Sequence, residues 1–145
     1  MTYEYKVLSL KELYENYLDL DVNKDLLAEP PRISFFKTSI DPNEIMFISL
    51  DGKKVIAIGS LESYDNYTYF KKYISVDYNY QNQGLGKKIL EKFYKYANEH
   101  QLAFINGKYS QQGQKYLQEN SIFLAKKYNI ICYENIDEYE KLFNC

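Results

Sequence analysis

The residues best suited to chemistry stand where a strand-like segment meets a helix-like one. Gln81, Gly84 and Gly86 follow one another at spacings of three and two residues, directly before an amphipathic run. The first four N–H groups of a helix lack an acceptor within the helix, and the aligned peptide dipoles place about half a positive charge there, so such a junction can bind an anion through its backbone. The spacing predicts either a phosphate-binding turn or an ordinary connection whose glycines relieve strain.

Two other nucleotide-binding interpretations of these glycines fail on spacing. A P-loop has four residues between its glycines and then Lys followed by Ser or Thr, whereas Gly84 to Lys88 has neither that spacing nor the hydroxyl. A dinucleotide-binding motif has a third glycine where this chain has Ile89. Both classes are therefore disfavoured.

An antiparallel meander is expected to lead into the junction. Residues 44–50 and 54–61 are rich in strand formers and flank Asp51-Gly52, a strong hairpin signal. After a turn at residues 63–66, a long strand is expected over residues 67–76. Strict alternation would place Lys71, Tyr73 and Ser75 on one face of that strand and Lys72, Ile74 and Val76 on the other.

The N-terminal segment predicts a strand followed by two helices. Residues 3–8 suit a strand, and Ser9 with Glu12 three positions later forms a capping box. Apolar residues at helical spacing then predict a helix that ends near Leu20. A second short helix is expected over residues 24–28, before two prolines that cannot continue it.

The segment after the junction predicts alternating helices and strands. A helix of about four turns begins at Gly84 and is followed by a buried strand over residues 102–106. Because a helix separates this strand from residues 67–76, the two strands can lie parallel, joined by a right-handed crossover. Residues 111–127 suit a helix and 129–133 a strand, whereas residues 137–143 fit a short helix and a strand equally well.

Composition limits the partners. The 145 residues, 46% hydrophobic and 26% charged, predict one domain spanning residues 1–145. A net charge of −2 gives no overall basic excess, so no nucleic-acid partner is expected, and only a local basic patch stays open. No apolar run approaches the ~20 residues of a membrane span and no signal peptide is evident, so no membrane partner and a cytoplasmic location are expected. Cys132 and Cys145 lack His or Cys partners at metal-ligand spacing, so no metal site is expected.

With these neighbours, the run from Val76 to Leu90 resembles the acetyl-CoA-binding signature of the GNAT superfamily of N-acetyltransferases. In that signature a strand ending in Val precedes an Arg/Gln-x-x-Gly-x-Gly/Ala turn and a helix, and Gln81, Gly84 and Gly86 fill its three positions. The order of the surrounding elements matches over most of the chain. The resemblance implies an α+β GNAT-like fold with a mixed, mostly antiparallel sheet, flanking helices and a splayed parallel strand pair that binds the coenzyme.

The resemblance also implies acetyl-CoA as the cofactor. Its pyrophosphate would accept hydrogen bonds from backbone amides at the helix start, and its pantetheine arm would pair with the strand over residues 67–76 like an added strand. The residues expected to bind it are Ile74, Ser75, Val76, Gln81, Asn82, Gln83, Gly84, Leu85, Gly86 and Lys87.

The implied reaction is direct transfer of an acetyl group to a primary amine of a small molecule or of a peptide or protein. A carboxylate or a water chain commonly takes the proton of the amine, and a tyrosine often protonates the departing thiolate. We expect Tyr116 to be that acid and Glu62 the base, with Glu44 as a second candidate. The competing interpretations are a core tyrosine at 116 and solvated surface carboxylates at 62 and 44.

The chain departs from the family pattern at two places. Gly113-Gln-Lys-Tyr-Leu117 lacks the usual Tyr…Gly-Phe context around the tyrosine. Only residues 130–145 follow Asn129, where relatives usually have two more strands. A second copy of the chain in a homodimer would supply a missing strand. These departures leave open a non-catalytic module that binds acyl-CoA and a protein partner.

Overall fold

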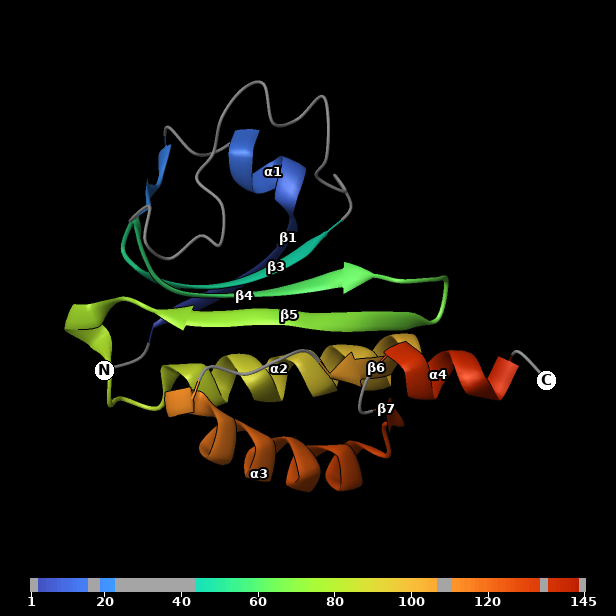
Figure 1. Ribbon diagram of the computed structural model, residues 1–145. Coiled ribbons are helices and arrows are strands. Elements are labelled where there is room, and N and C mark those ends of the chain that lie inside the picture. Colours follow the sequence, from blue (N-terminus) through green and yellow to red (C-terminus); the bar gives the residue numbers. More distant parts are fainter. Residues whose placement is uncertain (1–2, 16–18, 23–43, 107–110, 134–135, 144–145) are drawn as a thin grey trace.

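The computed structural model describes residues 3–15, 19–22, 44–106, 111–133 and 136–143. Within them, seven strands form one mixed sheet with α1 on one face and α2 and α3 on the other (Figure 1). The α+β class is therefore confirmed. The strands are β1 (Glu4–Ser9), β2 (Asp21–Val22), β3 (Ile45–Asp51), β4 (Lys54–Ser63), β5 (Thr68–Val76), β6 (Ala103–Asn106) and β7 (Cys132–Tyr133), and the helices are α1 (Leu10–Glu15), α2 (Leu85–His100), α3 (Gln111–Tyr128) and α4 (Ile136–Phe143).

The predicted meander forms the centre of the sheet. Strands β1, β3, β4 and β5 pair antiparallel in that order, and β3 and β4 are buried along most of their length. Met46 and Ile58 pack toward α1, whereas Phe47 and Leu61 pack toward α2. The nearly continuous apolar sequence of this hairpin is explained by helices on both of its faces.

A glycine lets α2 lie directly on the sheet. A Cβ at Gly59 of β4 would lie 2.5 Å from Cγ2 of Ile89 and 2.6 Å from Cζ of Phe93, so only a residue without a side chain fits. The ring of Phe93 packs edge-on against that of Phe47, with 4.9 Å between the centroids. The position of α2 is therefore fixed by close contact with two central strands.

The strict alternation predicted for β5 is wrong in its second half. The register against β4 shifts between Ser60 and Leu61, so that Lys72 has no counterpart on β4. The extra residue reverses the faces of the residues beyond it. Ile74 and Val76 consequently pack in the same cluster as Tyr69, on the α2 side.

Strand β6 pairs with β5 in parallel, as predicted, but over a short length. Residues 68–71 of β5 pair with residues 103–106 of β6, and the pairing ends at Lys71 and Asn106. In the part of the chain that the structure describes, the second half of β5 therefore has a neighbour on the β4 side only. This open edge lies immediately before the predicted anion-binding junction.

The N-terminal end of the chain differs from the prediction in detail. The capping box forms: the Ser9 amide donates to Oε1 of Glu12 (3.0 Å), which lowers the pKa of Glu12, and the Glu12 amide donates to Oγ of Ser9 (3.1 Å). This helix was predicted to end near Leu20. The helix that the structure describes, α1, covers Leu10–Glu15, and residues 16–18 lie outside the described residues. The helix predicted at 24–28 lies outside them as well. Strand β2, which pairs with the start of β4, was not predicted.

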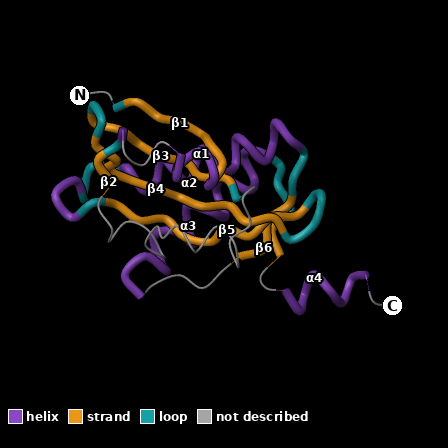
Figure 2. The backbone as a smooth tube through the Cα atoms, turned by 90° about the horizontal axis from the view of Figure 1, so that it is seen from above, coloured by secondary structure: helices purple, strands orange, loops and turns teal. Residues whose placement is uncertain are grey.

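At the C-terminal end, strand β7 is shorter than predicted and a helix follows it. Only Cys132 and Tyr133 pair, in parallel, with β6. Residues 136–143 then form α4, which extends away from the sheet at one end of the molecule (Figures 1 and 2). None of the helices in the described ranges is long and apolar enough to cross a membrane.

Because α2 approaches β4 closely at Gly59, one added methyl group at this position is expected to destabilise the protein. Gly59→Ala should lower the free energy of unfolding by about 1–3 kcal/mol, because the added carbon overlaps two fully buried side chains. Gly86→Ala is the matched control, since its Cβ would meet Val76 and Ile74 at 3.7 and 3.8 Å, ordinary contact distances. Urea unfolding measures both, and equal stability of the two variants would contradict the packing argument.

Candidate functional site

The connection from β5 to α2 begins with a capped turn. Asp77, which is buried, donates its amide to the carbonyl of Ile56 (2.8 Å), and its Oδ1 accepts from the amide of Asn79 (3.0 Å). It thereby caps the short 3-10 helix Tyr78–Tyr80. Asp77 therefore fixes the point at which the chain leaves the sheet.

Three side-chain contacts hold the turn against the rest of the sheet. The hydroxyl of Tyr80 donates to Oδ2 of Asp51 (2.9 Å), a bond to a carboxylate that raises the pKa of Tyr80. Nζ of Lys54 lies 5.2 Å from the centroid of the Tyr80 ring. The hydroxyl of Tyr3 donates to Oε1 of Gln83 (3.0 Å). The loop that carries the signature residues is thus held in position before any ligand binds.

The start of α2 has the backbone geometry of an anion site. Gly84 is the N-cap with φ of 77°, in the left-handed region that favours glycine. The first intrahelical bond joins the Lys88 amide to the Gly84 carbonyl (3.1 Å), so the amides of Leu85, Gly86 and Lys87 come before it. The first turn carries no acidic residue. Amide donors, the helix dipole and the charge balance all favour an anion here.

Gly86 joins this helix start to the open edge of β5. It is partly exposed, and a Cβ at this position would lie 3.7 Å from Cγ2 of Val76 and 3.8 Å from Cγ2 of Ile74. The end of β5 and the first turn of α2 therefore form one continuous surface.

The main-chain groups of β5 alternate between its two sides. In an antiparallel ladder the N–H and C=O of one residue point the same way, and those of the next residue point the opposite way. Since the Asp77 amide faces β4, the groups of Ser75 face β4 as well, and those of Ile74 and Val76 face away from it. Nε2 of Gln81 donates to the carbonyl of Val76 from that open side (3.4 Å).

The two candidate bases differ in their surroundings. Glu62 of β4 is half-buried and pairs in register with Phe70 of β5. Glu44, just before β3, is 4% exposed, and its carboxylate accepts a hydrogen bond from Oγ of Ser60. Its carbonyl also accepts from the Leu10 amide (2.7 Å). Glu44 therefore connects β3, β4 and the start of α1.

The candidate acid Tyr116 lies in the first half of α3. Its side chain is outside the described residues, as is that of Asn106 at the end of β6. The structure thus places Glu62 opposite Phe70, before the open edge of β5 begins, and leaves the place of the Tyr116 hydroxyl a prediction.

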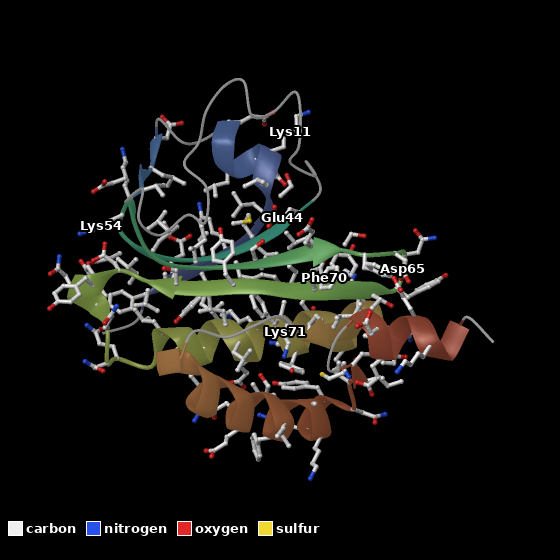
Figure 3. All side chains as sticks on the ribbon, in the orientation of Figure 1. Lys11, Glu44, Lys54, Asp65, Phe70 and Lys71 are labelled. Atoms are coloured by element: carbon white, nitrogen blue, oxygen red, sulfur yellow. The ribbon has the colours of Figure 1, made fainter. Side chains whose placement is uncertain are left out.

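Lys71 is a buried cation at the fork of β5 and β6 that sequence reasoning did not single out. It is 5% exposed, and its Nζ donates to the hydroxyl of Tyr94 (2.7 Å) and to Oγ of Ser121 (3.3 Å). Figure 3 shows it on the α2 side of the sheet and Glu44 on the α1 side. The signal available in the sequence was Lys71-Lys72 in a strand with no other charged residue, since adjacent side chains in a regular strand face opposite sides.

A sequence model of the acetyltransferase (GNAT) family matches residues 8–128, which include β3 to β6 and the whole junction. The chain belongs to the GNAT acetyltransferase family. The resemblance seen in the signature is therefore confirmed, and the chain is an acetyltransferase by descent. No curated protein sequence matches it significantly.

Solved structures show the same fold. A GNAT acetyltransferase from Elizabethkingia anophelis with acetyl-CoA bound is 21% identical, with a TM-score of 0.55 over 79% of this chain and 72% of that one. The ribosomal-protein-S18-alanine N-acetyltransferase from Escherichia coli is 19% identical, with a TM-score of 0.57 over 80% and 75%. A Tetrahymena histone acetyltransferase domain in complex with coenzyme A is 17% identical, with a TM-score of 0.57 over 83% and 76%.

Proposed function

We propose that this GNAT protein binds acetyl-CoA at the junction of β5 and α2 and transfers the acetyl group to a primary amine of a small molecule or of a peptide or protein. The observation that carries the proposal is the placement of Gln81, Gly84 and Gly86. They lie in the turn that leads into α2, a helix of 16 residues, beside the open edge of β5. The first amides of this helix have no acceptor within it, because its first internal hydrogen bond is donated by the amide of Lys88.

Backbone groups supply most of the coenzyme contacts in this proposal. The amides of Leu85, Gly86 and Lys87 donate to the pyrophosphate, and the left-handed Gly84 turns them toward it. The pantetheine arm lies along β5 and pairs with the outward-facing groups of Ile74 and Val76. Ser75 was predicted to contribute main-chain groups as well, and its place in the ladder favours a role within the sheet instead.

The remaining predicted coenzyme residues shape the loop. Gln81 holds the carbonyl of Val76, and Gln83 accepts from Tyr3, so these two side chains order the backbone next to the pyrophosphate. Asn82 has φ of 66° and thereby turns the chain between them. Their contribution is to position amides, which is why side-chain charge is not required at these positions.

Acetyl-CoA supplies a thioester carbonyl, and the protein must supply a base and an acid. We assign Glu62 as the base that takes the proton of the ammonium substrate, so that the neutral amine can form the new N–C bond. When the C–S bond breaks, Tyr116 would protonate the departing sulfur, and the second proton that the nitrogen must lose would restore the Tyr116 hydroxyl. Glu62 is preferred to Glu44 because the carboxylate of Glu44 is buried and bound to Ser60.

Turnover tests the proposed activity directly. The purified chain should release free thiol from acetyl-CoA when it is offered suitable members of a panel of small amines and peptides. Product mass should rise by one acetyl group on nitrogen. If calorimetry shows that the coenzyme binds but no amine in the panel is consumed, the chain is a non-catalytic acyl-CoA-binding module.

The coenzyme site is tested by charge at the first turn of α2. Gly86→Glu should weaken acetyl-CoA binding by at least about tenfold, because a carboxylate would stand within a few ångströms of the pyrophosphate. Gly86→Gln has nearly the same size without the charge and should weaken binding less. Calorimetry gives both affinities, and unchanged affinity in the Glu variant would remove the pyrophosphate from this position.

The role of Tyr116 as the acid is tested by removing its hydroxyl oxygen. Tyr116→Phe should lower kcat about a hundredfold while leaving acetyl-CoA affinity unchanged, since the loss affects only protonation of the thiolate. Tyr128→Phe near the end of the same helix is the control and should keep full activity. Wild-type kcat in Tyr116→Phe would return Tyr116 to a structural role in the core.

A further inference from the structure

Strand β1 forms one edge of the sheet (Figure 2). All of its residues, from Glu4 to Ser9, pair antiparallel with β3 in one continuous register. Among the strands that the structure describes, β1 has a neighbour on one side only. Its other side therefore presents a row of main-chain N–H and C=O groups with which a further strand can pair.

The contact at the end of β1 shows which main-chain groups face outward. The Leu10 amide donates to the carbonyl of Glu44 (2.7 Å), so the main chain of Leu10 faces the β3 side. Main-chain groups alternate along an antiparallel strand, so those of every second residue back to Glu4 face β3 as well. The residues between them face outward: Tyr5, Val7 and Ser9.

One of the outward-facing amides already has an acceptor. The Ser9 amide donates to Oε1 of Glu12 in the capping box (3.0 Å). The outward-facing groups that stay available to a partner strand are therefore those of Tyr5 and Val7, together with those of Tyr3 just before the strand.

The two faces of β1 differ in polarity. Leu8 packs with the core cluster on the α1 side, so Lys6 and Glu4 lie on that face. Nζ of Lys6 lies 4.0 Å from Oε1 of Glu4, and both side chains are more than half exposed. On the opposite face Tyr5 packs beside the α2-side cluster, and Val7 is 50% exposed. The edge thus carries a charged face and an incompletely covered apolar face.

A second copy of the chain can pair with this edge about a two-fold axis, and the side chains select the register. An axis between the two Lys6 residues, or between the two Glu4 residues, places like charges directly opposite each other, which is destabilising. An axis between the two Val7 residues places Tyr5 opposite Ser9, whose amide is already bound. An axis between the two Tyr5 residues places Glu4 of each copy opposite Lys6 of the other.

The register about Tyr5 also satisfies the rest of the edge. The outward groups of Tyr5 meet those of its copy, and those of Val7 meet those of Tyr3. Glu4 and Lys6 then occupy non-hydrogen-bonded positions, where opposite Cα atoms are about 4.5 Å apart and side chains are closest. The half-exposed side chain of Val7 is covered by the facing Tyr3. Helix α2 packs mainly on β3, β4 and β5, so it lies to one side of this edge.

We propose that two copies of this chain associate through β1, in an antiparallel pair with Tyr5 opposite Tyr5, so that one sheet runs through both copies. Lysines on edge strands usually oppose such pairing, but here Glu4 of each copy supplies the counter-charge for Lys6 of the other. The contact lies at the edge of the sheet opposite β7, so it does not add a strand to the C-terminal side.

Sedimentation equilibrium over a wide range of protein concentration tests the association. The purified chain should show a reversible equilibrium between one and two chains, with a larger dissociation constant at high salt because exposed ion pairs are screened. A chain that stays monomeric at every concentration would overturn the proposal.

Charge exchange tests the surface and its register. Glu4→Lys and Lys6→Glu each turn two attractive pairs into two repulsive ones and should raise the dissociation constant about tenfold. The chain with both substitutions again has opposite charges facing each other and should recover the wild-type constant. Lys95→Glu alters the net charge as Lys6→Glu does, but on the exposed side of α2, and should have little effect.

Urea unfolding of each variant separates loss of association from loss of fold, and Lys6→Glu serves where Glu4→Lys is unstable. A dimer whose constant is the same in the folded single variants as in the wild type would lie on another surface, and the proposal would be wrong. A double variant that dimerises no better than the single ones would overturn the register about Tyr5.

Discussion

The chain's function depends on an interruption of hydrogen bonding along β5. The first part of the strand is paired on both sides, but beyond Lys71 it has β4 alone as a neighbour in the described structure. Every main-chain polar group needs a partner, so an exposed strand edge inside a fold is a place where a ligand can complete the ladder. The bulge at Lys72 lies at this transition and turns Ile74 and Val76 toward α2. The open edge of β5 and the start of α2 therefore form one surface.

Close packing holds that surface in a single geometry. Gly59 allows Ile89 and Phe93 to touch the sheet, and Phe93 packs on Phe47, so α2 cannot shift without opening the core. Asp77 and Tyr80 fix the intervening loop from the sheet side. The amides at the start of α2 are thus held in place by residues that never touch the ligand, which is the arrangement that favours binding with little loss of entropy.

The sequence was sufficient for whatever follows from periodicity and local chemistry. The capping box at Ser9 and Glu12, the hairpin at Asp51-Gly52 and the amphipathic α2 each depend on neighbours within a few residues, and all are present. The bulge at Lys72 depends instead on how β4 pairs with it, and β2 owes its two residues to contact with the start of β4. Such features are decided by tertiary contacts, which a single sequence does not display.

The same limit applies to the candidate site. Gln81, Gly84 and Gly86 were recognisable because anion binding at a helix start has a local signature. The contrast between Glu44 and Glu62 was not, because it arises from Ser60 and Leu10, far from Glu44 in the sequence. A buried carboxylate that is bound to Ser60 contributes to the fold whatever it does in catalysis. A base must gain and lose a proton at each turnover, and the buried carboxylate of Glu44, bound to Ser60, is poorly placed for that, so Glu62 is preferred.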